Sequence, residues 1–200
     1  MKYKAIGFDW GGVINGQPGT NFSEAAAKNL GISQNIFLDS YYKHNTKFNR
    51  GDISAEQLWK LVCKDLGQPN KQNTLLEMQK RYNADSLNNN VLALVDQLRQ
   101  NGYKVGLLSN NTLENEAIML KNGLDKHFDI MHISADTKLV KPDPKAFLFF
   151  AEALGVQINE LIFIDDSIKS LSTAKQCGYT PILYESYNKL LKDLAVIGVI

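Results

Sequence analysis

Four short polar segments of this sequence, each following an apolar run, hold the residue types that bind a phosphate and its metal ion. They are Asp9, Ser109-Asn110-Asn111-Thr112, Lys141 and Asp165-Asp166. Neighbouring carboxylates repel one another unless a hard divalent cation such as Mg²⁺ compensates their charge. A lysine ammonium and a serine hydroxyl can both bind a phosphate oxygen. The four segments together therefore indicate a site for Mg²⁺ and a phosphoryl group.

The residues next to these segments favour a binding site. Gly11 and Gly12 follow Asp9, where they allow close approach of a ligand to the backbone and can supply amide donors to an anion. Lys141 precedes Pro142-Asp143-Pro144, which predicts an extended approach and then a helix beginning at Pro144. This arrangement can aim the Lys141 ammonium inward, toward a phosphate and an ionised carboxylate.

Each segment, taken singly, also has a purely structural explanation. An aspartate after a strand often forms a turn or caps a helix. Asp165-Asp166 would then begin a helix over residues 167–177, and Thr112 would cap the helix that follows it. A serine hydrolase is disfavoured, because no Gly-x-Ser-x-Gly surrounds Ser109 and no spacing suggests a general base among the three histidines, His44, His127 and His132.

The elements that must position these groups are buried strands. Apolar runs over residues 3–8, 105–108, 130–133, 161–164 and 181–183 predict strands, and from Val91 onward they alternate with helical patterns. This alternation predicts an α/β fold, with a Rossmann-like parallel sheet wrapped by helices. Ligands of such sheets bind beyond the carboxyl ends of the strands, which is where the four polar segments occur.

A helical insert interrupts the predicted sheet after its first strand. Residues 23–30, 34–44, 55–66 and 75–82 have helical spacing, and the glycines and proline between them predict breaks. The expected division is a core of residues 1–15 and 86–200 with a small helical bundle over residues 16–85. Asn88-Asn89-Asn90 is interpreted as a linker out of this insert.

The composition narrows the class of partner. Among 200 residues, Lys and Arg number 22 and Asp and Glu 21, so a net charge of +1 provides no broad attraction for nucleic acid or anionic lipid. No apolar run approaches the roughly 20 residues of a membrane-spanning helix, and the start of the sequence does not resemble a signal peptide. We expect a cytoplasmic protein with neither partner, in which Cys63 and Cys177 are free thiols; a protein partner stays open.

The four motifs together resemble those of the haloacid dehalogenase-like (HAD) hydrolase superfamily. The matching segments, in order, are Phe8-Asp9-Trp10-Gly11-Gly12-Val13, Leu107-Leu108-Ser109-Asn110, Lys141-Pro142-Asp143-Pro144 and Phe163-Ile164-Asp165-Asp166-Ser167. The insert resembles the small helical cap of that superfamily, and Arg50-Gly51-Asp52-Ile53-Ser54 resembles a common cap sequence. The resemblance implies a capped Rossmann-like core and a Mg²⁺-dependent phosphatase of small phosphorylated metabolites.

The resemblance also implies a role for each matching residue. Asp9 would be the nucleophile that forms an aspartyl-phosphate intermediate, and Lys141 would screen the phosphoryl charge. Ser109 would bind the phosphoryl oxygens, with Asn110 and Gly12 as further substrate-binding residues. Asp9, Asp166 and the backbone carbonyl of Gly11 would hold Mg²⁺, with Asp165 contributing directly or through water.

One position departs from the pattern of many phosphatases in the superfamily. Those enzymes carry a second aspartate two residues after the nucleophile, where this sequence has Gly11. That aspartate acts as a general acid and base, a contribution worth typically about 10²–10⁴-fold. Gly11 therefore implies a slower enzyme, or substrates with good leaving groups such as acyl phosphates, anomeric sugar phosphates or halides, and it puts phosphomutase activity in doubt.

Two other functions compete with a phosphatase. A 2-haloacid dehalogenase would use Asp9 to attack carbon, but its first motif has a Tyr-Gly-Thr-type continuation in place of Trp10-Gly11-Gly12, and carbon attack leaves the acidic pair Asp165-Asp166 unexplained. A catalytically weak domain that binds a phosphorylated ligand or a protein partner is the other alternative. Gly11 and the bulky Trp10 motivate it, whereas retention of the other motif residues speaks against it.

Substrate specificity is expected in the insert, which must open and close to admit substrate. The hinge positions predicted from loop composition are residues 15–19 and 85–90. The aromatic candidates also have a simple role as packing residues of the insert, and the lysine as a solvated side chain. The candidate substrate-facing residues are Asn15, Gln17, Tyr41, Tyr42, His44, Lys47 and Phe48.

Overall fold

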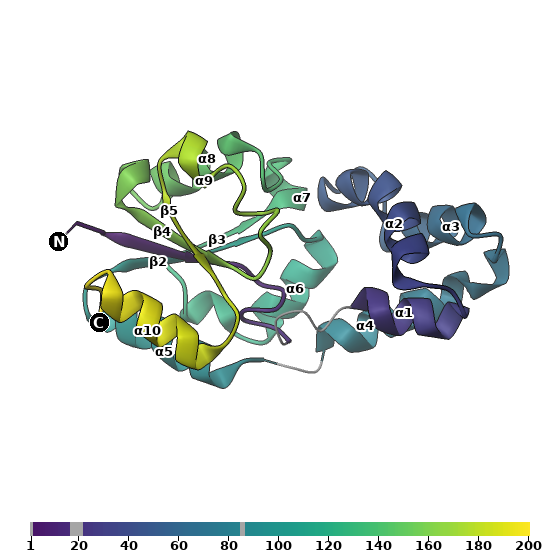
Figure 1. Cartoon of the computed structure of the whole chain (residues 1–200), viewed down its shortest axis with the longest axis horizontal. Coiled ribbons are helices and arrows are strands. Elements are labelled where there is room, and N and C mark those ends of the chain that lie inside the picture. The colour runs from purple at the N-terminus through teal and green to yellow at the C-terminus, as the bar shows by residue number, and fades with distance from the viewer. Residues whose placement is uncertain (1, 17–21, 85–86) are drawn as a thin grey trace.

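The chain folds into an open sheet with helices on both faces and a separate helical bundle beside one edge of that sheet (Figure 1). The structure is a computed structural model that describes residues 2–16, 22–84 and 87–200, and the side chains of residues 82–84 are left out of the description. Gln17 and parts of both predicted hinges, residues 17–19 and 85–86, lie outside the described residues.

The sheet has five parallel strands in the order β3-β2-β1-β4-β5. β1 lies at the centre, where Phe8 pairs with Leu107 of β2 on one side and with Ile164 of β4 on the other. The strand order therefore reverses across β1, which creates a ligand-binding position at its carboxyl end. The strands are β1 (Ala5–Phe8), β2 (Lys104–Ser109), β3 (Ile130–Ile133), β4 (Leu161–Asp165) and β5 (Thr180–Leu183).

Helices cover both faces of the sheet, which explains why the strands are apolar without alternation. One face packs α5 (Asn89–Gln100), α6 (Leu113–Lys121) and α10 (Tyr187–Val196) against residues such as Ile6 and Leu107. The other face packs α8 (Pro144–Ala153) and α9 (Ala174–Cys177) against Phe163. This arrangement confirms the predicted α/β, Rossmann-like fold. The remaining short elements are η2 (Leu124–Lys126), α7 (Ser134–Thr137) and η3 (Ile158–Glu160).

The bundle has an apolar core of its own, centred on the fully buried Trp59. The Trp59 indole donates a hydrogen bond to the Gln79 side-chain oxygen over 2.7 Å, so its one polar atom is satisfied. Ser54 and Gln57 form a capping box that fixes the start of α3. The bundle comprises α1 (Phe22–Leu30), α2 (Gln34–Asn49), α3 (Ala55–Asp65), the short η1 (Pro69–Lys71) and α4 (Gln72–Ala84).

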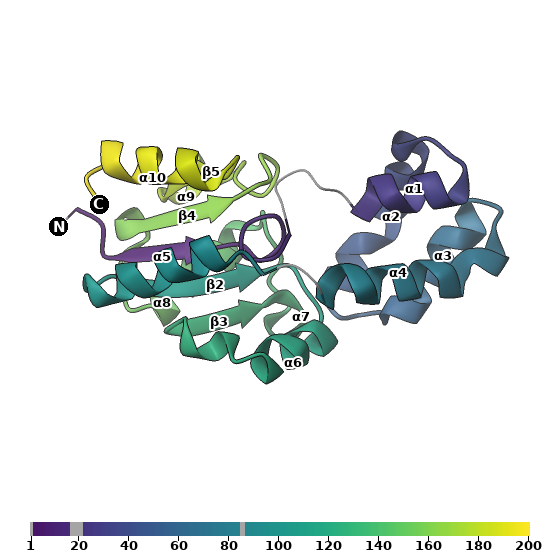
Figure 2. The ribbon, with the colours of Figure 1, turned by 90° about the horizontal axis from the view of Figure 1, so that it is seen from below.

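The strands point their carboxyl ends toward the bundle (Figure 2). The C-terminal end of α2 contacts α7, which directly follows β3. The Ser134 hydroxyl donates a hydrogen bond to the Asn49 carbonyl, and the Lys138 ammonium donates one to the Arg50 carbonyl over 2.6 Å. Carbonyls at a helix C-terminus lack partners within their helix and carry partial negative charge, which suits a hydroxyl and a cation. Two polar contacts thus connect bundle and core.

Two predicted boundaries were wrong for local reasons. Asn88 caps α5, because its side-chain oxygen accepts a hydrogen bond from the Val91 amide, so Asn89 and Asn90 belong to the helix and not to a linker. The helix expected over residues 167–177 begins only at Ala174. Residues 167–173 form turns, which begin where the Ser167 amide donates to the Asp165 carboxylate.

Other expectations about the chain agree with the fold. Cys63 is buried in α3 and Cys177 is half-buried, and both are free thiols. In the described part of the chain, every helix is too short or too polar to cross a lipid bilayer.

Candidate active site

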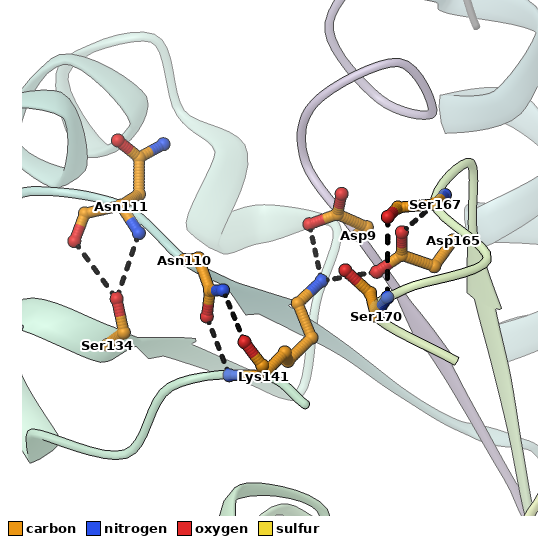
Figure 3. A network of polar contacts seen from close by, with 8 residues as sticks. All are labelled: Asp9, Asn110, Asn111, Ser134, Lys141, Asp165, Ser167 and Ser170. Atoms are coloured by element: carbon orange, nitrogen blue, oxygen red, sulfur yellow. Dashed lines mark hydrogen bonds and ion pairs between the residues drawn. The ribbon is translucent and has the colours of Figure 1, made fainter. Parts of the chain in front are cut away.

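Residues from three motifs converge beyond the carboxyl end of β1 (Figure 3). Asp9 directly follows β1, Asp165 ends β4, and Lys141 precedes α8. The Lys141 Nζ lies 2.7 Å from Asp9 Oδ1 and 2.6 Å from Asp165 Oδ2. The side chains are largely withdrawn from solvent, with exposed fractions of 2% for Lys141, 14% for Asp9 and 0% for Asp165. Because the three charges are buried, each depends on the others for compensation.

Asp165 uses both carboxylate oxygens within the protein. Oδ2 accepts from the Lys141 ammonium, and Oδ1 accepts from the Ser167 backbone amide over 2.8 Å (Figure 3). Ser167 in turn accepts a hydrogen bond from the Ser170 amide. These contacts fix Asp165 as the residue that orients Lys141 toward Asp9.

Asp166 lies close to the loop after β1. Gly12 has a φ of +73°, and a Cβ on it would lie 2.1 Å from Asp166 Oδ2. Glycine is required here both by the left-handed backbone and by the proximity of the carboxylate. Gly12, predicted to contact the substrate, therefore also makes room for Asp166.

The three carboxylates form a set suited to a divalent cation. Asp9, Asp165 and Asp166 each offer an oxygen atom, and these atoms all lie within 4.8 Å of one another. Hard cations such as Mg²⁺ bind oxygen ligands of this kind, usually through one or two carboxylates, with water completing the coordination. Since Asp165 already binds Lys141 and Ser167, the residues best suited to direct contact with Mg²⁺ are Asp9 and Asp166.

Asp9 is a buried carboxylate whose charge Lys141 compensates only in part. Burial, followed by the negative charge of Asp165, raises the pKa of Asp9 from 3.8 to about 7, although Lys141 acts in the opposite direction. Burial disfavours the charge on Lys141, yet the carboxylates of Asp165 and Asp9 outweigh it and raise the pKa of that ammonium. Lys141 therefore remains protonated, while Asp9 needs further positive charge to stay ionised at neutral pH.

Asn110 fixes the backbone of Lys141. Its side-chain amide donates to the Lys141 carbonyl over 2.9 Å, and its side-chain oxygen accepts from the Lys141 amide over 2.8 Å (Figure 3). The Lys141–Pro142 peptide bond is cis. Pro144 begins α8 behind an Asp143 cap, as its sequence predicted. Asn110, predicted to bind substrate, thus has a positioning role, although it also lines the cavity described next.

A cavity of about 210 Å³ opens in front of Asp9. Ser109, which ends β2, is 2% exposed and lines this cavity together with Asp9, Gly11 and Lys141. The bundle closes the other side through Tyr41 and Phe48. Three of the four predicted motifs, and the insert, therefore share one small polar chamber that can accept a phosphoryl group.

Tyr41 and Phe48, two of the predicted substrate-facing residues, both pack in the bundle and face the cavity. The Tyr41 ring stacks on Phe37 and Trp59 at centroid distances of 6.1 and 6.0 Å. Burial raises the pKa of the Tyr41 phenol to about 12, so the hydroxyl stays neutral. The packing and substrate-facing interpretations of these rings are compatible.

The other predicted specificity residues lie elsewhere. The Asn15 carbonyl accepts from the Gly12 amide over 2.7 Å, and the Asn15 amide donates to the Trp10 carbonyl, so Asn15 shapes the loop after β1. His44 lies 3.0 Å from Asp65 within the bundle, and the Lys47 side chain is exposed. Tyr42 lines a second, wider groove beside the cavity.

Five polar residues that line the cavity were not predicted to contact substrate: Asn49, Gln79, Asn111, Asn115 and Ser170. Asn111 uses its side-chain oxygen to accept from the Thr112 amide and from the Asn115 side chain, while its backbone amide donates to Ser134. Asn111 directly follows the second motif, but no local sequence pattern identifies Gln79, which lies in α4 and reaches the cavity through the packing of α4 against α3.

Comparison with known proteins identifies one family that matches most of the chain. The model of a family described as haloacid dehalogenase-like hydrolase matches residues 3–178. Three curated relatives illustrate the range. Bifunctional epoxide hydrolase 2 of Mus musculus is 27% identical over 56% of this chain and 21% of its own length. Phosphatase MT3486 of Mycobacterium tuberculosis is 30% identical over 53% and 52%, and (S)-2-haloacid dehalogenase 4A of Burkholderia cepacia is 32% identical over 44% and 38%.

The chain thus spans between about a fifth and about half of the length of these curated relatives. Among solved structures, the HAD family enzyme Bt-2542 of Bacteroides thetaiotaomicron, in complex with magnesium and inorganic phosphate, has a TM-score of 0.68 and 22% identity. That likeness covers 94% of this chain and 98% of the other. It extends over the core and the bundle together.

Proposed function

The chain belongs to the haloacid dehalogenase-like hydrolase family, and we propose that it is a Mg²⁺-dependent phosphatase of small phosphorylated metabolites. One observation carries this proposal. The Lys141 ammonium lies between the carboxylates of Asp9 and Asp165, 2.7 Å and 2.6 Å away, while Asp166 completes a set of three carboxylates around one point. A nucleophilic carboxylate beside a fixed cation and a metal-binding pair is suited to attack on an anionic phosphoryl group.

The proposed first step transfers the phosphoryl group to Asp9. The free Asp9 oxygen attacks phosphorus, the bond from phosphorus to the leaving oxygen breaks, and an aspartyl phosphate forms. The Lys141 ammonium favours the ionised form of Asp9 and reduces the repulsion between Asp9 and the phosphoryl oxygens. Ser109, at the end of β2 on the cavity wall, donates a hydrogen bond to one of those oxygens.

Asp9, Asp166 and the backbone carbonyl of Gly11 would hold Mg²⁺, with Asp165 acting through Lys141 or through water. When bound, Mg²⁺ supplies positive charge and Lewis acidity at the phosphoryl group. The residues fit such an ion because burial and the neighbouring carboxylates raise the pKa of Asp9 to about 7, a penalty that a cation would relieve.

The second step is attack of water on phosphorus, which releases inorganic phosphate and restores the Asp9 carboxylate. Gly11 provides no acid or base for either step. We therefore expect the best substrates to have leaving groups that hardly need a proton, such as acyl or anomeric phosphates.

We also propose that the helical bundle, residues 16–85, acts as a cap on the core of residues 1–15 and 86–200. Tyr41 and Phe48 of α2 already form one wall of the 210 Å³ cavity. A cap that closes over the site would exclude water from the first step. The free thiols Cys63 and Cys177 suit a reducing compartment, and we place the enzyme in the cytoplasm on that basis.

A 2-haloacid dehalogenase is the second candidate, since one relative carries that name. Attack on carbon needs a carboxylate nucleophile but no metal, and it would give no function to Asp166 beside Gly12. The third candidate, a domain that only binds a phosphorylated ligand, would retain three neighbouring carboxylates at a cost in stability without any catalytic gain. The phosphatase accounts for all of these groups.

The test is release of inorganic phosphate from a panel of phosphorylated metabolites, with Mg²⁺ and with a chelator. We expect turnover that requires Mg²⁺ and is lost in the Asp9→Asn protein. Hydrolysis that persists undiminished in Asp9→Asn would remove the mechanism. Chloride release from a 2-haloacid without added metal would favour the dehalogenase, and no turnover of any substrate would favour the binding domain.

A further inference from the structure

We propose that the substrate carries a second anionic group, a carboxylate or another phosphate, on the part that is not transferred. This inference rests on the proposed phosphatase function and specifies its substrate class. The observation behind it is a groove of about 620 Å³ between α2 of the bundle and the core, whose charged lining residues are predominantly cationic.

The groove adjoins the catalytic cavity. Asn49, Asn110, Lys141 and Ser170 line both spaces, so one wall passes from the first into the second. A phosphoryl group in front of Asp9 would therefore direct the rest of its molecule past Lys141 into the groove. The groove is roomy enough for a small metabolite, since its volume lies within the range of ordinary ligand pockets, about 300–1,000 Å³.

The charges along the groove are strongly asymmetric. Asp143 is the one carboxylate among its described lining residues, whereas five lining residues are cationic. Two of these cations have carboxylate partners, because Lys141 binds Asp9 and Asp165, and Arg50 lies 3.5 Å from Asp52. The other three are Lys138, Lys145 and Lys169.

In the part of the chain that the structure describes, these three lysines form no ion pair with a carboxylate. In the described ranges of the chain, no carboxylate oxygen lies within 4.0 Å of the Nζ atom of Lys138, Lys145 or Lys169. Asp143 is engaged with the backbone, since it accepts from the Lys145 amide over 2.9 Å. Uncompensated cations around one concave surface attract an anion more strongly than isolated surface lysines do.

Two of the lysines are held at the junction of bundle and core. The Lys169 Nζ lies 4.6 Å from the centroid of the Tyr42 ring, which places a core ammonium against α2 without neutralising it. Lys138 adopts a left-handed conformation with φ of 64° and donates to the Arg50 carbonyl. An anionic group in the groove would meet these two core ammonium groups beside α2 of the bundle.

A second opening from the catalytic cavity is less suitable for the same part of the substrate. It has a volume of about 430 Å³ and shares Phe48, Gln79 and Asn115 with the cavity. Its charged lining residues are Glu56, Glu114 and Lys80, a mainly acidic set that would repel a phosphorylated compound. The cationic groove is therefore the better path for an anionic substrate.

The experiment compares pairs of substrates that differ only in the distal charge. One arm uses ω-phosphooxy alkanoic acids of three to six carbons against their primary amides, and a second uses alkanediol bisphosphates against the monophosphates. We expect kcat/KM to be at least about tenfold higher for the anionic partner at the best chain length, as charged hydrogen bonds allow. The arm with the larger ratio distinguishes a carboxylate from a phosphate.

Lysine variants locate the preference. Lys169→Gln and Lys145→Gln are each expected to reduce the ratio of anionic to neutral kcat/KM by about threefold to tenfold, and the double variant more. Lys192→Gln, on the exposed surface of α10, is the control and should leave the ratio unchanged. Added salt should reduce the ratio in the wild-type protein, because the lysines are partly solvated.

The outcomes separate this inference from the function on which it rests. Equal kcat/KM within every pair would overturn the second anionic group while leaving the phosphatase intact. A preference that survives in the Lys145→Gln, Lys169→Gln double variant would overturn the assignment to this groove. Absence of Mg²⁺-dependent hydrolysis with both arms and with the metabolite panel, acyl and anomeric phosphates included, would overturn the phosphatase, and this inference with it.

Discussion

The carboxyl ends of the core strands, here called the core edge, face the same cavity as the bundle. The two regions present very different polar groups to that cavity. At the core edge, Lys141 and Asp165 are almost fully buried, and each of their charges has a partner within 2.7 Å. On the bundle side and around the adjoining groove, Tyr42 and Lys169 are exposed and meet only through a cation–π contact of 4.6 Å.

This difference has a physical reason. Buried charges must be compensated by neighbours at fixed positions, so a catalytic group placed there is held accurately. Exposed charges are compensated by water and can be exchanged at little cost to the free energy of unfolding. The core edge is therefore suited to chemistry on a group common to many substrates, and the bundle side to recognition of the variable remainder.

The largest effect should come from the nucleophile. Asp9→Asn keeps the size of the side chain but removes the attacking oxygen, and we expect kcat to fall by about 10⁴-fold or more. Phosphate release measured at saturating substrate and Mg²⁺ gives the ratio. A decrease in kcat of less than about tenfold would mean that another residue forms the covalent bond. Even loss of a general acid or base usually costs more than about tenfold, and loss of the nucleophile should cost more still.

Lys141→Met should strongly reduce the stability of the folded protein, because it removes a buried charge at the core edge. It leaves Asp165 buried without a cation, so we expect the free energy of unfolding to fall by about 3–5 kcal/mol, the usual result of breaking a buried ion pair. Urea unfolding measures this loss.

Lys169→Met in the groove is the matched control for that experiment. Its side chain is exposed, so the free energy of unfolding should change by less than about 0.5 kcal/mol. Similar losses in the two variants would contradict the distinction between a buried, mutually dependent site and a solvated groove.

Gly11→Asp should add the missing acid. A Cβ on Gly11 would meet no heavy atom within 4 Å, and its φ lies outside the left-handed region, so the loop can accept the side chain. We expect about a tenfold gain in kcat for alkyl phosphates, at the low end of general acid catalysis. Aryl phosphates, which need no proton on the leaving group, should gain less, and equal gains for both would argue against an acid role.

The pKa of Asp9 predicts a pH-dependent stability. Its value of about 7 in the folded protein exceeds the ordinary 3.8, so the folded state binds the proton more tightly. The resulting stabilisation is complete below about pH 4 and is lost as pH rises through about 7. In chelator-treated protein, we expect the free energy of unfolding to fall between pH 4 and 8 by about 1–3 kcal/mol more in wild type than in Asp9→Asn.

Mg²⁺ provides a second arm of the same experiment. It should stabilise the wild-type protein at pH 8, where Asp9 is ionised, and stabilise Asp9→Asn less. Parallel pH profiles for the two chelator-treated proteins would show that Asp9 has no raised pKa.

The smallest effect should come from the contact between bundle and core. Ser134 is fully buried, donates to the Asn49 carbonyl and accepts from the Asn111 amide. Ser134→Ala removes both contacts, and we expect KM to rise about threefold to tenfold. Ser33→Ala, which removes a cap within the bundle, is the control and should leave KM unchanged. An equal rise in both variants would indicate a general loosening of the bundle.

The sequence was sufficient for the core edge because its residues follow strands. An apolar run fixes the position of a strand, and parallel strands bring their carboxyl ends to one edge, so Asp9, Ser109 and Asp165 could be placed together before any coordinates. The helical insert could also be predicted, since the spacing of apolar residues changes there from that of strands to that of helices.

The cationic groove and the polar network behind the cavity could not be predicted in this way. Lys138, Lys145 and Lys169 come from different loops and helices of the core and line one groove beside α2. The sequence also could not predict whether the Asp165 carboxylate binds Mg²⁺ or Lys141. That depends on which carboxylate oxygen faces which cation in the folded protein. Side-chain pairings over long sequence separations leave no periodic pattern.

The most direct test of the account is to trap the covalent intermediate. The reaction with a good acyl or aryl phosphate is quenched in acid during turnover, and the peptide that contains Asp9 is sequenced by tandem mass spectrometry. We predict one phosphoryl group on Asp9 in the presence of Mg²⁺, and none in the chelator-treated or Asp9→Asn protein. Turnover that leaves Asp9 unmodified, with the phosphoryl group on Ser109 or on no residue at all, would contradict the proposed chemistry.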